Sequence, residues 1–274
     1  MIPDAGTMNL ISHCANELAR AESARHPIEP LTRTYPQLSV PDAYKVQQAN
    51  VQRRLVRGEH VIGHKIGLTA KAMQELFNVS EPDYGHLMNT MLHDAREPLE
   101  LGALIDPQIE VEPAFVLGRR LQGPGVSVAD VLAATVYVRV CLEVIDSRII
   151  DWRIRLPDTV ADNGSSARVV LGQRLVQPSG LALDDMDTEL ELDGSVVETG
   201  NTNAILGHPA RSIAWLANRI SEFGIALEPG HIVLPGTCTR SVRISGHRQV
   251  IGRIAGLGEV VLHLTGTSAI SKDG

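Results

Sequence analysis

Two glutamates, Glu110 and Glu112, stand two residues apart in the otherwise apolar stretch 109–117. Residues two apart in a β-strand face the same side, with Cα atoms roughly 6.5 Å apart, so both carboxylates would point to one place. A third glutamate, Glu143, lies on the polar face of a second, alternating stretch over 136–145. Three carboxylates close together in a low dielectric repel one another unless a divalent ion neutralises them. An oxygen-only ligand set favours Mg²⁺ or Mn²⁺ over Zn²⁺.

Each part of this metal-site hypothesis has a plainer alternative. A Glu-x-Glu pair in a strand is most often a solvent face, because carboxylates are rarely buried. Glu143 is as well explained by a salt bridge to Arg139 or Arg148. The metal interpretation is favoured by the apolar residues around the pair and by Pro113, which limits hydrogen bonding along the strand.

A candidate for proton transfer, Lys65, lies between two glycines in the sequence GHKIGLT. A lysine on an apolar strand can be partly desolvated, which lowers its pKa and suits it to donate or accept a proton. The alternative is a solvated lysine at the end of a strand. The glycines do not form a phosphate-binding loop, since neither GxxxxGK[ST] nor GxGxxG is present.

Three further polar segments could complete a site. Asp83 lies in Pro-Asp-Tyr-Gly, which is typical of a turn, and Ser165 lies in a polar stretch over 158–166 that we expect to be a loop. Thr237 follows an expected strand, where backbone N–H and hydroxyl groups could bind a carboxylate. Each segment is also compatible with an ordinary loop. His208 precedes a helix and is expected to cap it rather than to bind a metal.

The elements that must position these residues are helices followed by strands. Apolar residues at helical spacing predict two amphipathic helices in the first sixty residues, separated by an irregular, proline-rich connector over 26–36. Beyond residue 60, alternation and glycine punctuation predict short strands, with an Asp-Gly hairpin turn. The predicted strands are 61–68, 109–117, 136–145, 188–192, 195–198, 231–234, 241–244, 250–254 and 260–264, and the predicted helices between them are 70–77, 129–134 and 213–220.

This pattern predicts an α+β fold in which a mixed β-sheet domain over 61–268 carries a helical N-terminal extension over 1–60. The length of 274 residues and the 43% of hydrophobic residues are sufficient for a sizeable core. The net charge of −7 and the 3% of aromatic residues argue against nucleic acid as a partner.

The cysteines and the apolar segments bear on the compartment. Cys14, Cys141 and Cys238 are far apart and odd in number, which suggests neither a disulfide framework nor a CxxC metal site and favours a reducing cytoplasm. The first residues lack a basic segment followed by an apolar run, so no signal peptide is expected. No stretch approaches the roughly 18 continuous apolar residues of a membrane helix, so no membrane partner is expected.

Taken in order, seven segments resemble one enzyme family. They are GHKIGLT, EPDYG, PQIEVEPAFVLGRRLQGP, CLEVIDSRIIDW, DTVADNGSS, LGHPARSIAWLANRI and VLPGTCTR. Over residues 24–264 the chain resembles the 2-hydroxypenta-2,4-dienoate (2-keto-4-pentenoate) hydratases of the fumarylacetoacetate hydrolase superfamily. Among these it is most similar to the hydratases that follow meta-cleavage in aromatic and steroid ring degradation. The resemblance implies the β-roll of the fumarylacetoacetate hydrolase C-terminal type.

The resemblance also implies residue roles. They are Glu110, Glu112 and Glu143 as ligands of one Mg²⁺ or Mn²⁺, Lys65 and Asp83 as catalytic residues, and Ser165 and Thr237 as residues facing the substrate carboxylate. Asp83 is expected to act as base for water and Lys65 as acid or electrostatic partner. Two departures from the family pattern, Pro113 and Gly164, bear on fine geometry rather than on the reaction type.

The implied reaction is hydration of a 2-hydroxy-2,4-dienoate to a 4-hydroxy-2-oxoalkanoate. The alternatives are decarboxylation of a 2-oxo-3-enedioate, since 4-oxalocrotonate decarboxylases share these motifs but typically carry an apolar residue in place of Asp83, and a non-catalytic partner subunit. Carbon–carbon bond hydrolysis is disfavoured because no matching histidine-glutamate dyad is present. The resemblance further implies a homo-oligomer, a pentamer or decamer, that could associate with a related pathway enzyme.

Overall fold

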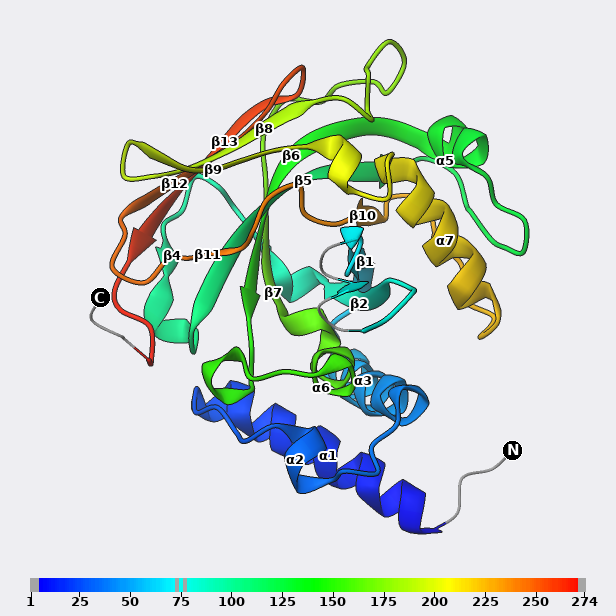
Figure 1. Cartoon of the computed structure of the whole chain (residues 1–274), viewed down its shortest axis with the longest axis vertical. Coiled ribbons are helices and arrows are strands. Elements are labelled where there is room, and N and C mark those ends of the chain that lie inside the picture. Colours follow the sequence, from blue (N-terminus) through cyan, green and yellow to red (C-terminus); the bar gives the residue numbers. More distant parts are fainter. Residues whose placement is uncertain (1–4, 72–73, 76–77, 271–274) are drawn as a thin grey trace.

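Two β-sheets form the larger part of the structure, with helices below them and on one side (Figure 1). The computed structural model describes residues 5–71, 74–75 and 78–270. One sheet has the strand order β2-β1-β10-β5-β6-β7-β3, with β11 paired to β5, and the other has the order β4-β13-β12-β8-β9. The strands are β1 Val61–Gly67, β2 Asp83–Met88, β3 Leu92–His93, β4 Leu99–Glu100, β5 Pro107–Leu117, β6 Thr135–Asp146, β7 Ser166–Leu171, β8 Asp187–Leu192, β9 Ser195–Asn201, β10 Ile232–Leu234, β11 Val242–Arg243, β12 Gln249–Ile254 and β13 Gly258–Thr265.

Helices connect and cover these strands. The described α-helices are α1 Ala5–Ala24, α2 Leu31–Thr34, α3 Val40–Val56, α5 Val128–Ala134, α6 Leu156–Ala161 and α7 Pro209–Ser221, and the 3-10 turns are η1 Asn89–Met91, η2 Leu101–Ala103, η3 Ile150–Trp152, η4 Asn163–Ser165 and η5 Thr202–Ala204. The α+β fold is confirmed, and the predicted strands end within a few residues of the observed ones. The predicted helix 70–77 includes residues 72–73 and 76–77, which lie outside the described residues.

The centre of the fold is the long antiparallel pair of β5 and β6. Its register runs from Pro107 opposite Asp146 to Leu117 opposite Thr135. On its other edge β5 pairs with β11 at residues 108–109 and with β10 at residues 115–116, so Pro113 falls between the two partners. A proline is tolerated there because its missing N–H removes no bond from either short ladder.

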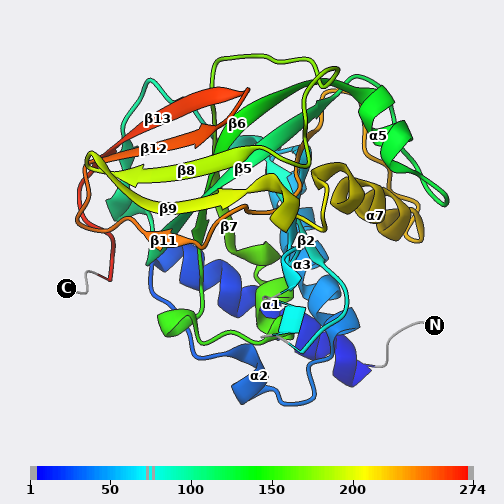
Figure 2. The ribbon, with the colours of Figure 1, turned by 45° about the horizontal axis from the view of Figure 1, so that its top comes forward.

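The five-stranded sheet covers one face of β5 and β6 (Figure 2). Its strand β12 approaches closely at Gly252, where a Cβ would lie 2.8 Å from Leu142 Cδ2. Alternating apolar residues of both sheets fill the core between them, including Val111, Val144 and Val250. Because side chains on a strand alternate between faces, the residues between these positions face the opposite side of the first sheet.

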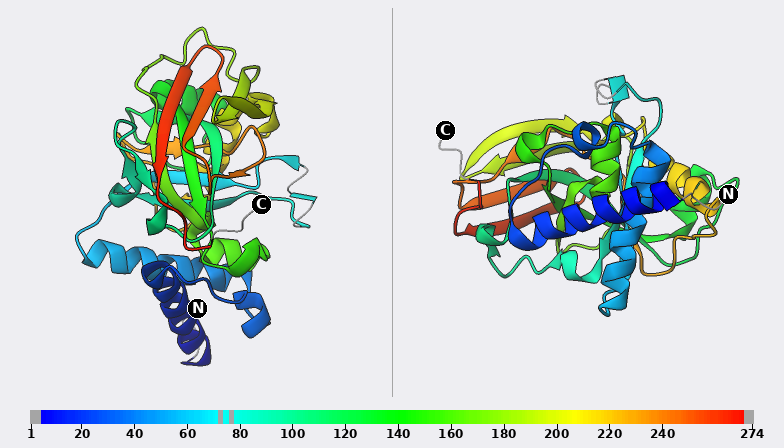
Figure 3. Two further views of the ribbon diagram at one scale, coloured as in Figure 1. Left: turned by 90° about the vertical axis from the view of Figure 1, so that its left-hand side faces the viewer. Right: turned by 90° about the horizontal axis from the view of Figure 1, so that it is seen from below.

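The N-terminal helices lie beneath the sheets (Figure 3). Cys14, Leu18 and Val46 pack in one apolar cluster with Ile149 and Val160 from the sheet-bearing part of the chain. The connector between α1 and α3 is not wholly irregular as predicted, because it contains the one-turn helix α2. Proline just before a helix is compatible with its start, since a first-turn residue needs no N–H partner. The division at residue 60 stays a prediction.

Two segments predicted as a turn and a loop are regular structure. Asp83 begins β2, where it pairs with Gly67 of β1, so the turn expected at Pro-Asp-Tyr-Gly is wrong. The ladder to β1 supplies backbone partners that outweigh the local turn preference. The stretch 158–166 forms most of α6, then η4, then the start of β7. Pro157 lies in the first turn of α6 and Asp158 accepts a hydrogen bond from Arg155 N, which are features of a helix start.

Two further local predictions, the His208 cap and the Asp-Gly hairpin turn, are confirmed. The three cysteines are buried and unpaired. His208 caps α7, with its Nδ1 accepting a hydrogen bond from Ala210 N at 3.0 Å. Asp193 and Gly194 both have positive φ in the hairpin between β8 and β9. Across the described ranges, the helices are too short or too polar to cross a bilayer.

Candidate active site

Three glutamate carboxylates meet on the face of β5 and β6 that points away from the second sheet. Glu110 lies directly opposite Glu143 in the antiparallel register, and Glu112 follows two residues along β5. One carboxylate oxygen from each lies within 4.8 Å of the others. Glu112 and Glu143 are buried and Glu110 is half-buried. The solvent-face alternative is therefore wrong.

The salt-bridge alternative for Glu143 is also wrong. Arg139 Nε donates to Gly172 O, and Arg148 pairs with Asp162. Both oxygens of Glu143 are buried without a hydrogen-bond partner. Burial raises the pKa of Glu143 although the Lys65 charge opposes the increase, and burial raises the pKa of Glu110 to about 7. Buried carboxylates of this kind are stabilised by a hard divalent cation, so the residues fit a metal centre.

The loop after β10 holds one of these carboxylates in place. Gly236 N donates to Glu112 Oε2 at 2.9 Å. One backbone donor of the segment that was expected to bind a ligand carboxylate, Gly236 N, thus binds a glutamate of the cluster. Gly236 has a φ of +118°, and a Cβ there would lie 2.1 Å from Thr69 Oγ1, so this approach requires glycine.

Lys65 joins the cluster from β1. Its Nζ lies 3.7 Å from Glu143 Oε2. Burial alone would lower the pKa of Lys65, but the negative charges of Glu143 and Glu110 raise it above its usual value. The predicted lowering of this pKa is therefore wrong as long as no cation neutralises the glutamates. A cation held by the glutamates would oppose that increase, because it repels the ammonium ion. Gly164, with a φ of +60°, leaves room for this side chain, since a Cβ there would lie 3.1 Å from Lys65 Cδ.

Asp83 stands at the start of β2, on the same side as Lys65. Its side chain is 3% exposed, and Oδ1 has no hydrogen-bond partner. Burial raises the pKa of Asp83, and the Lys65 charge partly offsets the increase. A carboxylate with a raised pKa and a free oxygen is suited to take a proton from a substrate or from water.

Lys65, Asp83 and Glu110 open into one cavity of about 170 Å³. Its polar lining includes Lys65, Asp83, Glu110, Ser165 and Thr237, so the structure brings together the residues that the sequence singled out. Thr237 Oγ1 donates to Thr239 O at 3.0 Å. The roles of the individual residues stay predictions.

Comparison with known proteins agrees with this arrangement. The model of the fumarylacetoacetate (FAA) hydrolase C-terminal family matches residues 70–265. The chain belongs to the fumarylacetoacetate hydrolase family. The described cavity is thus the candidate active site of a member of that family, and the family fold expected from the seven motifs is confirmed.

Within this family, the chain is similar to named hydratases in sequence and to a decarboxylase in structure. The 2-hydroxypent-2,4-dienoate hydratase of Pseudomonas putida is 44% identical over 218 residues, covering 79% of this chain and 98% of the relative. The 2-oxo-hept-4-ene-1,7-dioate hydratase of Escherichia coli is 41% identical over 234 residues, covering 83% and 88%. The structure of 4-oxalocrotonate decarboxylase from Pseudomonas putida G7, complexed with magnesium and adipate, superposes with a TM-score of 0.88 at 33% identity, covering 97% and 99%.

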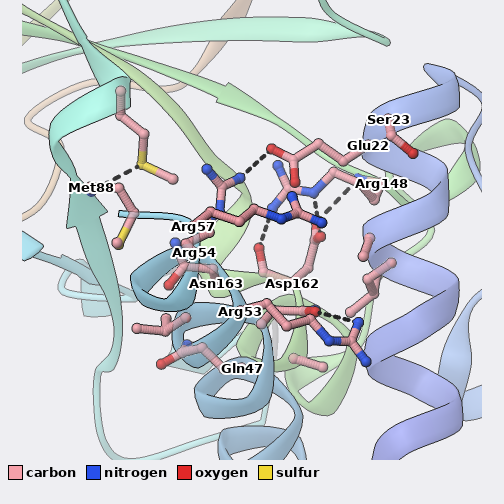
Figure 4. Close-up of a pocket in the computed structure, with 16 residues that line it drawn as sticks. Glu22, Ser23, Gln47, Arg53, Arg54, Arg57, Met88, Arg148, Asp162 and Asn163 are labelled. Atoms are coloured by element: carbon pink, nitrogen blue, oxygen red, sulfur yellow. Dashed lines mark hydrogen bonds and ion pairs between the residues drawn. The ribbon is translucent and has the colours of Figure 1, made fainter. Parts of the chain in front are cut away.

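A buried network next to the site of this family member pairs Arg148 with Asp162 (Figure 4). Arg148 Nε donates to Asp162 Oδ1, and Ser165 Oγ donates to Asp162 Oδ2 at 3.0 Å. The hydroxyl of Ser165 therefore donates its proton to Asp162, and toward the cavity it can act only as a hydrogen-bond acceptor. Sequence reasoning missed Arg148 and Asp162 as a pair, because Arg148 lies only a few residues after Glu143, just beyond the end of β6, and only the fold directs its side chain to Asp162.

Proposed function

We propose that this protein hydrates a 2-hydroxy-2,4-dienoate to a 4-hydroxy-2-oxoalkanoate with a bound Mg²⁺ or Mn²⁺. The observation that carries the proposal is the buried Asp83 carboxylate, which has an oxygen without a hydrogen-bond partner and lines the cavity with Lys65 and with Glu110 of the glutamate cluster. The names of the hydratase relatives, at 41–44% identity over most of the chain, support the same reaction.

The metal would be held by Glu110, Glu112 and Glu143, whose buried oxygens form the only group of three or more suitable ligands among the described residues. When bound, a divalent cation supplies Lewis-acid stabilisation of negative charge on the substrate's 2-oxygen. The fit rests on the donor set, because both oxygens of Glu143 are buried without a hydrogen-bond partner.

The residues of the chain would move the protons. The 2-hydroxyl group loses its proton while C5 gains one, which gives an α,β-unsaturated 2-oxo acid. Water then adds its oxygen to C4 and a proton returns to C3, so the net change is the addition of one water. Asp83 would accept the proton of the attacking water, and protonated Lys65 would donate to the substrate.

A second candidate reaction is decarboxylation of a 2-oxo-3-enedioate on the same metal. The observation that favours it is the close structural likeness to 4-oxalocrotonate decarboxylase. Asp83 favours hydration instead, because decarboxylation requires no base for water. The intact set of Lys65, Asp83 and the glutamates weighs against a non-catalytic partner subunit.

Loss of the ultraviolet absorbance of 2-hydroxypenta-2,4-dienoate tests the proposal. We expect rapid loss with Mg²⁺ present and at least about 10³-fold slower loss after treatment with EDTA, with recovery when Mg²⁺ is restored. Full activity of the metal-stripped protein would contradict the metal requirement. Release of carbon dioxide from 4-oxalocrotonate, without hydration of the dienoate, would establish the decarboxylase instead.

Gly67→Ala is expected to lower the hydration rate by about tenfold to hundredfold, because small displacements of a catalytic group cost rates of this order. A Cβ on Gly67 would lie 2.2 Å from Asp83 Oδ1 and would force that carboxylate to move. Steady-state kinetics measure the loss. Because the alanine acts through Asp83, it should cost little more in an Asp83→Asn background, whereas additive losses would contradict the mechanism.

The cytoplasmic setting, the place in meta-cleavage catabolism, the homo-oligomer and an associated pathway enzyme stay predictions. The edge strand β9 supports assembly, because Val196 and Val197 are 52% and 39% exposed on it. Exposed apolar edge strands are commonly covered by a partner chain.

A further inference from the structure

The relatives do not determine the tail of the substrate. Two hydratases with similar sequence identity to this chain are named for a five-carbon dienoate and for a seven-carbon dioate. We infer that the cavity of this protein selects a substrate with an uncharged tail, hydrogen or methyl, and rejects one that ends in a second carboxylate. This inference rests on the proposed function. It concerns the walls of the cavity away from the glutamate cluster.

Those walls are apolar on the side reached along β6. Ile145 stands two residues beyond Glu143 on the same strand and therefore faces the same side. Trp152 and Ile154 follow in the segment after β6, and all three line the cavity. A tail that extends from the metal end in this direction meets the hydrocarbon of these three side chains.

The same segment carries two arginines that could have bound a carboxylate. Residues 152–155 have the sequence Trp-Arg-Ile-Arg, so apolar and cationic side chains alternate. Trp152 and Ile154 are partly buried and line the cavity, whereas Arg153 and Arg155 are exposed and do not. Arg153 pairs with Glu29 at 3.0 Å on the outside. A shift by one residue would exchange the two faces, so the local backbone decides the character of the wall.

That backbone is fixed by several contacts. Asp151 and Trp152 both have a φ of +55°, which a non-glycine residue adopts only when its surroundings impose it. Trp152 Nε1 donates to Asp106 O at 3.0 Å. Ile150 N donates to Ile28 O at 2.9 Å, so the N-terminal connector holds the segment as well. The apolar face of the segment is thereby kept toward the cavity.

The charges around the cavity disfavour a second carboxylate. Lys65 is the only cation among the described residues that line it, and this ammonium lies beside Glu143. Asp83 and Glu110 also line the cavity and would repel another anion. Arg243, on β11, pairs with Asp106 at 2.9 Å and does not line the cavity. A distal carboxylate would thus lose water without gaining a cationic partner.

Binding and turnover can be measured separately. Calorimetry of the Mg²⁺-loaded protein with the saturated analogues 2-oxopentanoate and 2-oxoheptanedioate should give an affinity at least about tenfold higher for the first. Equal or tighter binding of the dioate would overturn the inference. Hydration of 2-hydroxypenta-2,4-dienoate is assayed in parallel. Its absence, with the affinity ratio as expected, would refute the proposed function while the tail preference stands.

Variants of the wall sharpen the test. Ile154→Arg places a cation on the cavity side and should shift the affinity ratio toward the dioate by about tenfold. The control Ile154→Met, which places an unbranched side chain without a charge there, should keep the preference for the neutral tail. Arg153→Ala should leave the ratio unchanged, because Arg153 faces Glu29. A selective loss of dioate binding in Arg153→Ala would show that this arginine reaches the tail and would contradict the inference.

Discussion

Replacing Glu143 by glutamine is expected to lower kcat/KM for hydration by about 10³-fold or more and to abolish tight Mg²⁺ binding. Glu143 is fully buried, lies opposite Glu110 and has two oxygens without a hydrogen-bond partner. The amide keeps the shape of the side chain but removes the charge and one acceptor oxygen. Calorimetric titration with Mg²⁺ and steady-state kinetics measure the two effects.

The same substitution should not unfold the protein. Burial raises the pKa of Glu143, so its ionised form destabilises the metal-free fold at pH values above that pKa, and the neutral amide removes this cost. We therefore expect metal-free Glu143→Gln to melt no lower than the metal-free parent. Glu189→Gln, at an exposed position on β8, is the matched control and should retain metal binding and activity. Retained Mg²⁺ affinity in Glu143→Gln would remove Glu143 from the ligand set.

The metal centre was accessible to sequence reasoning because a strand has a simple period. Glu110 and Glu112 had to share a face once residues 109–117 formed a strand, and apolar flanks indicated that the face was buried. The register that sets Glu143 against Glu110 was not accessible. It depends on the whole length of the β5 and β6 pair, and a slip of one residue would turn Glu143 to the other face.

Where local preference and tertiary pairing disagree, sequence reasoning failed. Pro-Asp-Tyr-Gly is a good turn sequence, yet Asp83 begins a strand because β1 offers it a partner. Arg148 lies close to Glu143 along the chain, yet its guanidinium is bound by Asp162 from the end of α6. Both errors concern contacts between residues distant in sequence, which propensity and spacing do not encode.

The position of Asp83 leads to the second large effect. Asp83→Asn is expected to lower the hydration rate by about 10²- to 10⁴-fold, the usual contribution of a general base, while Mg²⁺ affinity changes little. Asp83 lines the cavity but is not one of the three clustered glutamates, so charge removal here should leave the metal ligands intact. Asparagine has nearly the same shape, and Oδ1 makes no hydrogen bond that the change could break.

The pH profile separates a base from a residue that only shapes the cavity. Burial raises the pKa of Asp83, so the parent should lose activity on acidification at a higher pH than an exposed aspartate would impose. In Asp83→Asn the residual activity should lack this acidic limb, whereas the exposed control Asp184→Asn should keep the parental profile. A hydration rate of the Asp83→Asn variant equal to that of the wild type would exclude Asp83 as the base. The water would then have to be activated by Lys65 or by the metal alone. That result would also remove the feature that separates this site from a decarboxylase.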